Sequence, residues 1–443
     1  MTGMPLGNAA PKPAPTGSLK GTIEALGGGI LSARAYCESC LERVRANEAV
    51  IKAWAALDED RARALAATCD VRHARGPLHG IPVGVKDIFD TEDLPTEMGS
   101  PAFVGNRPAK NAELVARIIA AGGYVLGKTV TTEFAFMHPA ETRNPWNPRH
   151  TPGGSSSGSA AAVAAGHVPA AVGTQTNGSV IRPAAFCGVV GFKPTVDTLP
   201  IHGILPFAQT LDHVGLFART VADVAYLTAE LADPGAFAAE IDALSRPPRV
   251  AVLQRFPWNA SEPAAAVHLQ TTLNRLAAAG TEVEAIDLPD DFEDAHRVHR
   301  TIMFYEGARE HAPKQAMHRR LFSAELNAAI DEGLAISHDE YRGALAKRAA
   351  IAEIALDLFD GRDAVASLPA PGAAPARLDI TGDPSFCTLW TLLGFPALTL
   401  PTGLSGEGLP YGIQLAGAAR DDGRLLRVAR WCESVIGFDQ FPR

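Results

Sequence analysis

Helical and strand-like stretches alternate along most of the chain, and this alternation restricts the fold more than any other feature of the sequence. The clearest unit spans residues 248–289, where RVAVLQ, AAVHLQTTLNRLAAAG and EVEAIDLP predict a strand, an amphipathic helix and a strand. The same order appears in AELVARIIAAGG and the strand YVLGK that begins at Tyr124. Alternating helices and strands are typical of α/β proteins. We expect one large β-sheet with α-helices on both faces.

The N-terminal end of the chain and one internal segment differ from the alternating pattern. Residues 1–18 lack the apolar segment of a signal peptide and predict a flexible tail. Residues 19–443 are then expected to form a single domain. Residues 290–360 are helical and rich in charge, and predict a helical lobe laid over the core.

Composition excludes several classes of partner. The net charge is −9, from 40 basic and 49 acidic residues, which argues against a nucleic-acid partner. The chain has no run of 18 apolar residues, so we expect no membrane partner. Six scattered cysteines without a secretion signal predict reduced thiols in a cytoplasmic protein. Cys37 and Cys40 are expected to be two thiols one helical turn apart.

Three motif matches lack the structural context that their chemistry needs. GGYVLGKT, from Gly122, matches a P-loop, but no helix follows that could receive a phosphate. GSSSG would make Ser156 an elbow nucleophile, yet the proline-broken NPWNPRHTP precedes it where a strand is required. His296 and His299 lie near Glu293 without H-E-x-x-H spacing, so we expect a solvated helix face and no metal site.

The segment GTQTNGSVIRPAAFCGVVGFKPT, residues 173–195, predicts a strand that ends in a tight turn. Asn177 and Gly178 both tolerate a positive φ. Successive N–H groups in such a turn can form an anion-binding nest, which would place Ser179 beside an oxyanion hole. The local sequence is equally compatible with a structural turn before a buried strand.

The combination of these segments resembles the amidase signature family. GIPVGVKD, GGSSSGS and FCGVVGFKPT carry the resemblance, with Ser155 standing 24 residues before Ser179. GKTVTTEFAF, LDHVGLFARTVAD and PALTLPTGLSGEGLPYGIQLAG extend it over residues 19–440. The resemblance implies a large, mixed and twisted β-sheet flanked by α-helices. It implies an amidase that acts on linear amides without a cofactor or metal ion. It also implies that the lobe at 290–360 covers the active site, and related small amidases often form homodimers.

The resemblance also implies the roles of individual residues. Matching motif to motif puts the nucleophile at Ser179, the bridging serine at Ser155 and the catalytic lysine at Lys86. The oxyanion hole is expected to use the N–H groups of the turn, those of Thr176, Asn177, Gly178 and Ser179. Ser156, Ser157 and Ser159 are expected to brace the turn, and Ser156 is expected to contact substrate as well.

The chemistry of a serine–serine–lysine group requires a neutral lysine. Lysine has a pKa of about 10.4 in water and is then a poor base at neutral pH. Lys86 ends the apolar strand IPVGVK, where desolvation would disfavour the ammonium form. Lys128 and Lys193 are rival bases, although neither maps to the catalytic position.

Departures from the family pattern bear on the substrate. Gln175 and Asn177 replace the aspartate and glycine of many members, and Arg182 stands three positions after the nucleophile where two are usual. This variant resembles malonamidase-type members, whose arginine binds a substrate carboxylate. The alternative is that Arg182 pairs with an internal acid such as Asp212.

Three functions follow from these observations. The first is a stand-alone amidohydrolase of a small amide, carboxylate-bearing or urea-like, that forms a serine acyl-enzyme. The second is an amidotransferase A-type subunit that supplies ammonia to a partner chain. The third, a non-catalytic scaffold, is disfavoured because all three catalytic positions are filled.

Overall fold

The computed structural model describes residues 18–442 apart from 72–75, 234, 236, 238–241, 243, 254 and 255. Of the predicted tail at 1–18, only Ser18 is described, and its side chain caps the first helix by accepting a hydrogen bond from Gly21 N. The remainder of that tail lies outside the described residues.

An eleven-stranded sheet runs through the described part of the chain in the order β1-β3-β2-β4-β6-β5-β10-β11-β9-β7-β8. β2 pairs in parallel with β3 and β4, and β7 pairs in parallel with β8 and β9. The other neighbours are antiparallel, so the sheet is mixed, as predicted. The strands are β1 Trp54–Leu57, β2 Pro82–Lys86, β3 Tyr124–Thr129, β4 Ala170–Gln175, β5 Val190–Lys193, β6 His213–Ala218, β7 Arg249–Leu253, β8 Glu282–Ile286, β9 Ala364–Ser367, β10 Ala397–Leu404 and β11 Pro410–Ala416.

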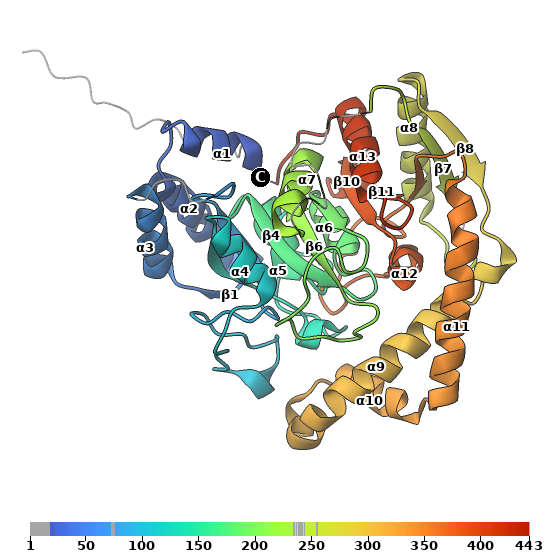
Figure 1. Cartoon of the computed structure of the whole chain (residues 1–443), viewed down its shortest axis with the longest axis horizontal. Helices are drawn as coiled ribbons and strands as arrows, with labels where there is room; N and C mark the ends of the chain where they lie inside the picture. The colour runs from blue at the N-terminus through green and yellow to red at the C-terminus, as the bar shows by residue number, and fades with distance from the viewer. Residues whose placement is uncertain are drawn as a thin grey trace, which may run out of the picture.

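Helices cover both faces of this sheet (Figure 1). The helices are α1 Leu19–Gly27, α2 Ala33–Ile51, α3 Glu59–Asp70, α4 Glu113–Ala120, α5 Ser157–Ala164, α6 Ile181–Cys187, α7 Val221–Leu231, α8 Pro263–Ala278, α9 Ala295–His318, α10 Ala324–Ala335, α11 His338–Ala355, α12 Ser385–Leu392 and α13 Asp422–Ile436. The predicted α/β class is therefore confirmed.

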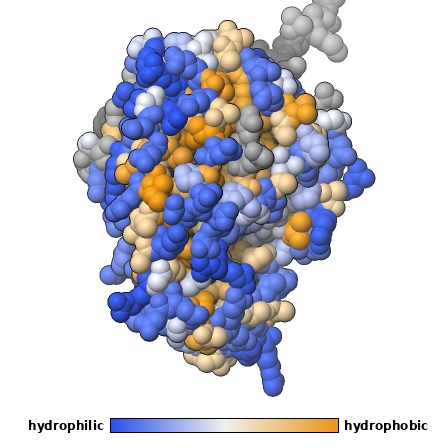
Figure 2. Space-filling model, turned by 90° about the vertical axis from the view of Figure 1, so that its right-hand side faces the viewer, coloured by the Kyte–Doolittle hydropathy of each residue, from blue (hydrophilic) through white to orange (hydrophobic). Residues whose placement is uncertain are grey.

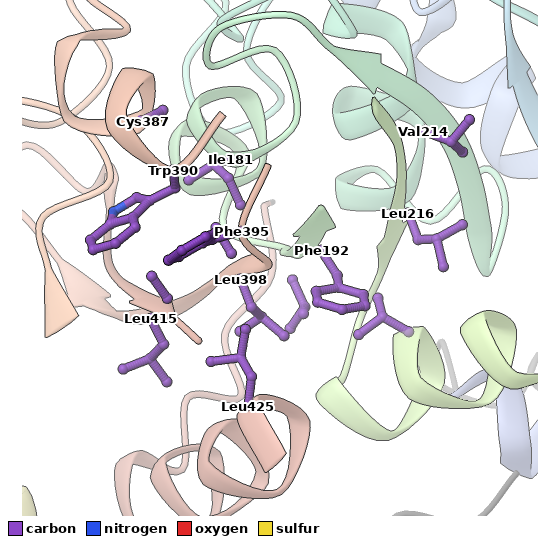
Figure 3. Close-up of a cluster of buried hydrophobic side chains, with 14 of the residues drawn as sticks. Ile181, Phe192, Val214, Leu216, Cys387, Trp390, Phe395, Leu398, Leu415 and Leu425 are labelled. Carbon is purple, nitrogen blue, oxygen red and sulfur yellow. The ribbon is translucent and has the colours of Figure 1, made fainter. Parts of the chain in front are cut away.

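Two separate hydrophobic clusters show which helices lie on which face. Successive side chains of a strand point to opposite faces, and in β4 Val172 belongs to one cluster while Ala171 belongs to the other. The first cluster includes apolar residues of α4, α7 and α13, and the second includes those of α2, α3 and α5. Figure 3 shows part of the first cluster, where Trp390 and Phe395 lie in the same core as Phe192 and Leu398.

Helices α9, α10 and α11 form an arm along the lower right of the molecule in Figure 1. They occupy most of the charged segment that the sequence analysis assigned to helices. On the face shown in Figure 2, hydrophilic side chains predominate and hydrophobic ones form scattered groups. Within the described ranges, no helix combines the length and apolar character that a membrane span requires.

The glycine–serine stretch before α5 is packed into the core. Its residues 153–164 are all buried, and Gly158 N donates a hydrogen bond to Val130 O at 3.0 Å. A Cβ atom at Gly158 would lie 2.3 Å from both Ala53 O and Val130 N. Gly158 therefore lets the helix approach the backbone of β3 and the segment before β1.

We expect Gly158→Ala to lower the free energy of unfolding by about 1–3 kcal/mol, since backbone atoms would have to move to admit the methyl group. Gly343→Ala is the matched control. Gly343 is exposed within α11 and has open space at its Cβ position, so alanine should raise stability by about 0.5–1 kcal/mol. Urea unfolding of both variants measures the difference, and equal stabilities would contradict this account of the packing.

Candidate active site

The catalytic centre predicted from the sequence lies where two parallel strands end side by side. Val85 of β2 is in register with Val172 of β4, so Lys86 and Thr174 emerge at the same edge of the sheet. Ligand sites of α/β sheets form at the carboxyl ends of such strands. Lys86 is fully buried, and its Nζ donates to Ser155 Oγ at 2.8 Å and to Thr174 Oγ1 at 2.9 Å. Two of the three predicted catalytic residues are therefore in direct contact.

The surroundings of Lys86 favour its neutral form. Burial lowers the pKa of Lys86 to about 7, although the negative charge of Asp212 opposes this shift. The two hydrogen-bond partners of Nζ are neutral hydroxyl groups, and no carboxylate of the described residues lies within ion-pair distance of it. At neutral pH a substantial fraction of this amine is therefore unprotonated.

Ser155 and Ser156 lie in the buried bend before α5, and their hydroxyl groups have different partners. The peptide bond between Gly154 and Ser155 is cis. Ser156 Oγ donates to Thr174 O at 3.1 Å and accepts from Thr174 N at 3.3 Å. This hydroxyl braces the bend against β4, as expected, and the contact of Ser156 with substrate stays a prediction. Among the described residues, no strand leads directly into the bend, in agreement with the exclusion of an elbow nucleophile.

The other two serines also brace this region. Ser157 Oγ donates to Val130 O at 3.4 Å, and Ser159 Oγ donates to Val172 O at 3.0 Å. Ser159 also shares a hydrogen bond of 2.7 Å with Thr129 Oγ1. Both side chains thus tie the helix to neighbouring strands, as expected.

The turn at 176–179 is held by its carbonyl groups. His299 Nε2 donates to Thr176 O at 2.8 Å, and Thr391 Oγ1 donates to Asn177 O at 2.5 Å. In the part of the chain that the structure describes, the N–H groups of Asn177, Gly178 and Ser179 have no protein acceptor. This arrangement leaves consecutive donors available to an anion.

Gln175 connects this turn to the helix that follows. Its Oε1 accepts from Val180 N at 2.8 Å and Ile181 N at 3.0 Å, and its Nε2 donates to Thr391 Oγ1 at 2.9 Å. The side-chain oxygen thereby accepts from two N–H groups at the start of α6, as an aspartate oxygen could. An aspartate, however, has no N–H group that could donate to Thr391 Oγ1. A family departure at this position thus has a structural role in this chain.

Ser179 lies at the end of the turn, directly before α6, and is 8% exposed. Its hydroxyl makes no hydrogen bond to Ser155 or to any other group of the described residues. The structure thus joins Lys86 to Ser155 directly and leaves Ser179 Oγ uncommitted to another protein atom.

Arg182 projects from α6 and is buried beside the turn. Its Nη2 donates to Gly154 O at 2.7 Å and to Thr381 Oγ1 at 3.3 Å, whereas Nε and Nη1 lack a partner among the described residues. Burial lowers the pKa of Arg182 to about 10, so the guanidinium is still charged at neutral pH. Asp212 instead accepts hydrogen bonds from Thr176, Phe207 and Ala208, and the alternative of an Arg182–Asp212 pair is wrong.

The two rival lysines are engaged elsewhere. Lys128 Nζ lies 3.1 Å from Asp87 Oδ1 and donates to the carbonyls of Phe89 and Pro95. Its position inside β3 also agrees with the exclusion of a P-loop. Burial lowers the pKa of Lys193 to about 7 as well, but among the described residues its Nζ donates only to carbonyl oxygens, those of Pro194 and Phe395. All three lysines are buried, so burial does not distinguish them. The hydrogen bond from Lys86 Nζ to Ser155 Oγ does distinguish Lys86 from Lys128 and Lys193.

The expectation of a solvated face for His296 and His299 is wrong. His296 stacks on Trp258 with ring centroids 4.5 Å apart, and His299 is buried against the turn. Their helix packs against α12, which removes this face from solvent. No group of three metal-ligating side chains occurs among the residues described.

Three contacts in the site were missed by the sequence analysis. The contact of Thr174 could have been predicted, because Thr174 is a small polar residue on the strand that leads into the turn. The local sequence around His299 and Thr391 contains no signal that they would reach a turn more than 100 residues away.

Comparison with known proteins identifies the family. The amidase family model matches residues 35–426. The A-type subunit of the glutamyl-tRNA(Gln) amidotransferase of Chloroflexus aurantiacus is 35% identical, over 91% of this chain and 93% of its own length. A solved amidase superposes with a TM-score of 0.87 at 32% identity, covering 94% of this chain and 99% of that one. The peptide amidase of Stenotrophomonas maltophilia gives a TM-score of 0.83 at 28% identity, covering 96% and 98%.

The match covers the segments that hold Lys86, the serine bend and the turn, and the solved relatives share the complete fold. The chain therefore belongs to the amidase family and is an enzyme that hydrolyses carbon–nitrogen bonds.

Proposed function

We propose that this enzyme hydrolyses a small carboxylate-bearing or urea-like amide through a Ser179 acyl-enzyme, with Ser155 as proton relay and Lys86 as base. The hydrogen bond of 2.8 Å between a buried lysine and Ser155 is the observation that supports this most strongly. A lysine without a carboxylate partner can accept a proton from that hydroxyl. The chemistry uses neither a metal ion nor a cofactor.

The proposed reaction proceeds in two halves. Neutral Lys86 takes the Ser155 proton while Ser155 takes the Ser179 proton, and Ser179 Oγ attacks the amide carbon. The relay then returns a proton to the leaving nitrogen, the carbon–nitrogen bond breaks and ammonia departs. Water repeats the sequence on the ester and releases the carboxylate product.

The turn would stabilise the charge that forms on the carbonyl oxygen. We assign the oxyanion hole to the N–H groups of the turn, Thr176, Asn177, Gly178 and Ser179. The unpartnered donors of the last three support this assignment. One such donor typically contributes about 2.7–4 kcal/mol to transition-state stabilisation. The hydrogen bonds from His299 to Thr176 O and from Thr391 to Asn177 O fix the shape of the turn and would therefore affect the rate.

Arg182 is the proposed carboxylate site. Two donors of its buried guanidinium have no partner among the described residues, and a buried charged group without partners is costly unless a ligand supplies them. A carboxylate a few bonds from the scissile carbon would accept both in a bidentate pair. The same proposal places the helical lobe over this site, since His299 of α9 already contacts the turn. A homodimer and a cytoplasmic location stay predictions.

The amidotransferase alternative rests on the similarity to the Chloroflexus amidotransferase chain. The net charge of −9 and the position of Arg182 favour a stand-alone enzyme. Purified protein that releases ammonia from a mono-amide of a dicarboxylic acid, with no other chain present, supports the first function. Ammonia release that depends on an added partner chain would support the second.

Ser179→Ala should abolish this activity, by about four orders of magnitude or more, because no nucleophile is left. The variant should also lose labelling by a fluorophosphonate, whereas Ser157→Ala should keep both labelling and turnover. Retained ammonia release by Ser179→Ala would contradict the assignment of the nucleophile.

Lys86→Ala should lower kcat/KM by several orders of magnitude at pH 7, with partial recovery at high pH where hydroxide can replace the base. In the wild type, kcat/KM should rise with pH through a midpoint near 7, because burial lowers the pKa of Lys86 and only the neutral amine is active. Near-normal activity of Lys86→Ala at pH 7 would contradict the relay.

Arg182→Ala should lower kcat/KM for carboxylated amides by about 100-fold or more, and far less for neutral amides of the same length. Arg182→Lys should recover only part of the loss, since lysine keeps the charge but not the two-pronged geometry. Equal losses on both substrate types would show that Arg182 acts through Gly154 and not through a substrate carboxylate.

A further inference from the structure

Asp212 is a buried carboxylate that the proposed mechanism does not use. It directly precedes β6, and its Oδ1 accepts a hydrogen bond of 2.5 Å from Thr176 Oγ1. Its Oδ2 accepts from Phe207 N at 2.7 Å and Ala208 N at 3.1 Å. One carboxylate therefore connects the first residue of the turn to a separate loop.

The same carboxylate lines a crevice that is too narrow to admit a water molecule. Thr174, which contacts Lys86 Nζ, lines this crevice together with Thr176. The rest of the lining is apolar and consists of Ala135, Ile201, Ile204, Leu205 and Phe207. Asp212 and Lys86 are both buried, and charges in such surroundings interact more strongly than they would in water.

The groups around this carboxylate come from several elements. The charge of Asp212 acts on Lys86, and Glu306 of α9 is the acid that acts on Asp212 itself. The helical arm also holds the far end of the loop, because Thr210 N donates to Glu306 Oε2 at 2.9 Å and Arg348 Nη1 donates to Thr210 O at 3.0 Å. His299 contacts the turn as a neutral donor, since burial lowers its pKa to about 4.

We propose that Asp212 is a positioning residue of the catalytic centre, which fixes the oxyanion turn through Thr176 and whose negative charge stabilises the ammonium form of Lys86. This inference rests on the proposed function, because it assumes that Lys86 is the base. It adds a fourth side chain to the serine–serine–lysine group and connects that group to the helical arm.

The two roles of Asp212 can be separated. Burial raises the pKa of Asp212 to about 7, which is also the value to which burial lowers the pKa of Lys86. When Asp212 is ionised, it holds the Lys86 proton more tightly, and when its charge is removed, Lys86 releases that proton at a lower pH. The hydrogen bond from Thr176 is independent of this effect, because a neutral amide can replace the carboxylate in it.

Asp212→Asn is the central test. Its amide oxygen can accept from Phe207 N and Ala208 N while its amide donates to Thr176 Oγ1, so the bridge is kept and the charge is lost. In a plot of kcat/KM against pH, the rise on the acidic side (the acidic limb) should move to lower pH by about 0.5 unit or more. A limb that stays in place or moves to higher pH would overturn the electrostatic role.

Asp422→Asn is the matched control. Asp422 is also buried and accepts from Thr195 N and Thr195 Oγ1, but its charge acts on Lys193. The acidic limb of this variant should coincide with that of the wild type. An equal shift in Asp422→Asn would show that loss of any buried acid moves the limb, and would also overturn the proposal.

Thr176→Val and Thr176→Ser test the positioning role and remain available if Asp212→Asn does not fold. Valine removes the donor to Asp212 and should lower kcat and the rate of Ser179 labelling by about tenfold, with little change in KM. Serine restores the hydroxyl and should recover most of both rates. Equal rates in the two variants would overturn the positioning role. Ser179→Ala distinguishes failure of this inference from failure of the proposed function. Retained activity in Ser179→Ala would refute the proposed function itself.

Discussion

The burial of one lysine between two parallel strands is the constraint on which the rest of the structure depends. β2 and β4 carry Lys86 and Thr174 to the same edge of the sheet, and the serine bend closes over them. A buried ammonium group without a carboxylate partner is unfavourable, and the protein accommodates it by lowering its pKa to about 7. The bracing serines hold the bend that carries Ser155 against the neighbouring strands.

The turn beside Lys86 is held from separate parts of the chain. His299 reaches it from α9, Thr391 from α12 and Asp212 from the start of β6, and each of them binds a different group of the turn. An oxyanion hole is effective only when its donors are already oriented before the reaction. The helical arm is therefore part of the framework that holds this turn, which gives a physical reason for a charged helical segment between strands of one sheet.

Much of this architecture could be predicted from the sequence, and the failures have identifiable causes. The strands that end at Lys86 and Gln175 are apolar and short, and both were expected. Helix α6 was missed because all of Ile181–Cys187 is buried, so no amphipathic period marks it. The burial of His299 was missed because it depends on contacts between α9 and distant segments, which a local charge pattern does not encode.

The pKa of Lys86 is the most direct test of the account's central claim. In protein labelled with ¹⁵N-lysine, the Nζ resonance that is absent from Lys86→Ala can be followed as a function of pH. We predict a titration midpoint of about 7, as burial in the apolar edge of the sheet requires. A midpoint near the ordinary lysine value of about 10.4 would mean that the amine is a cation at neutral pH and cannot serve as the base.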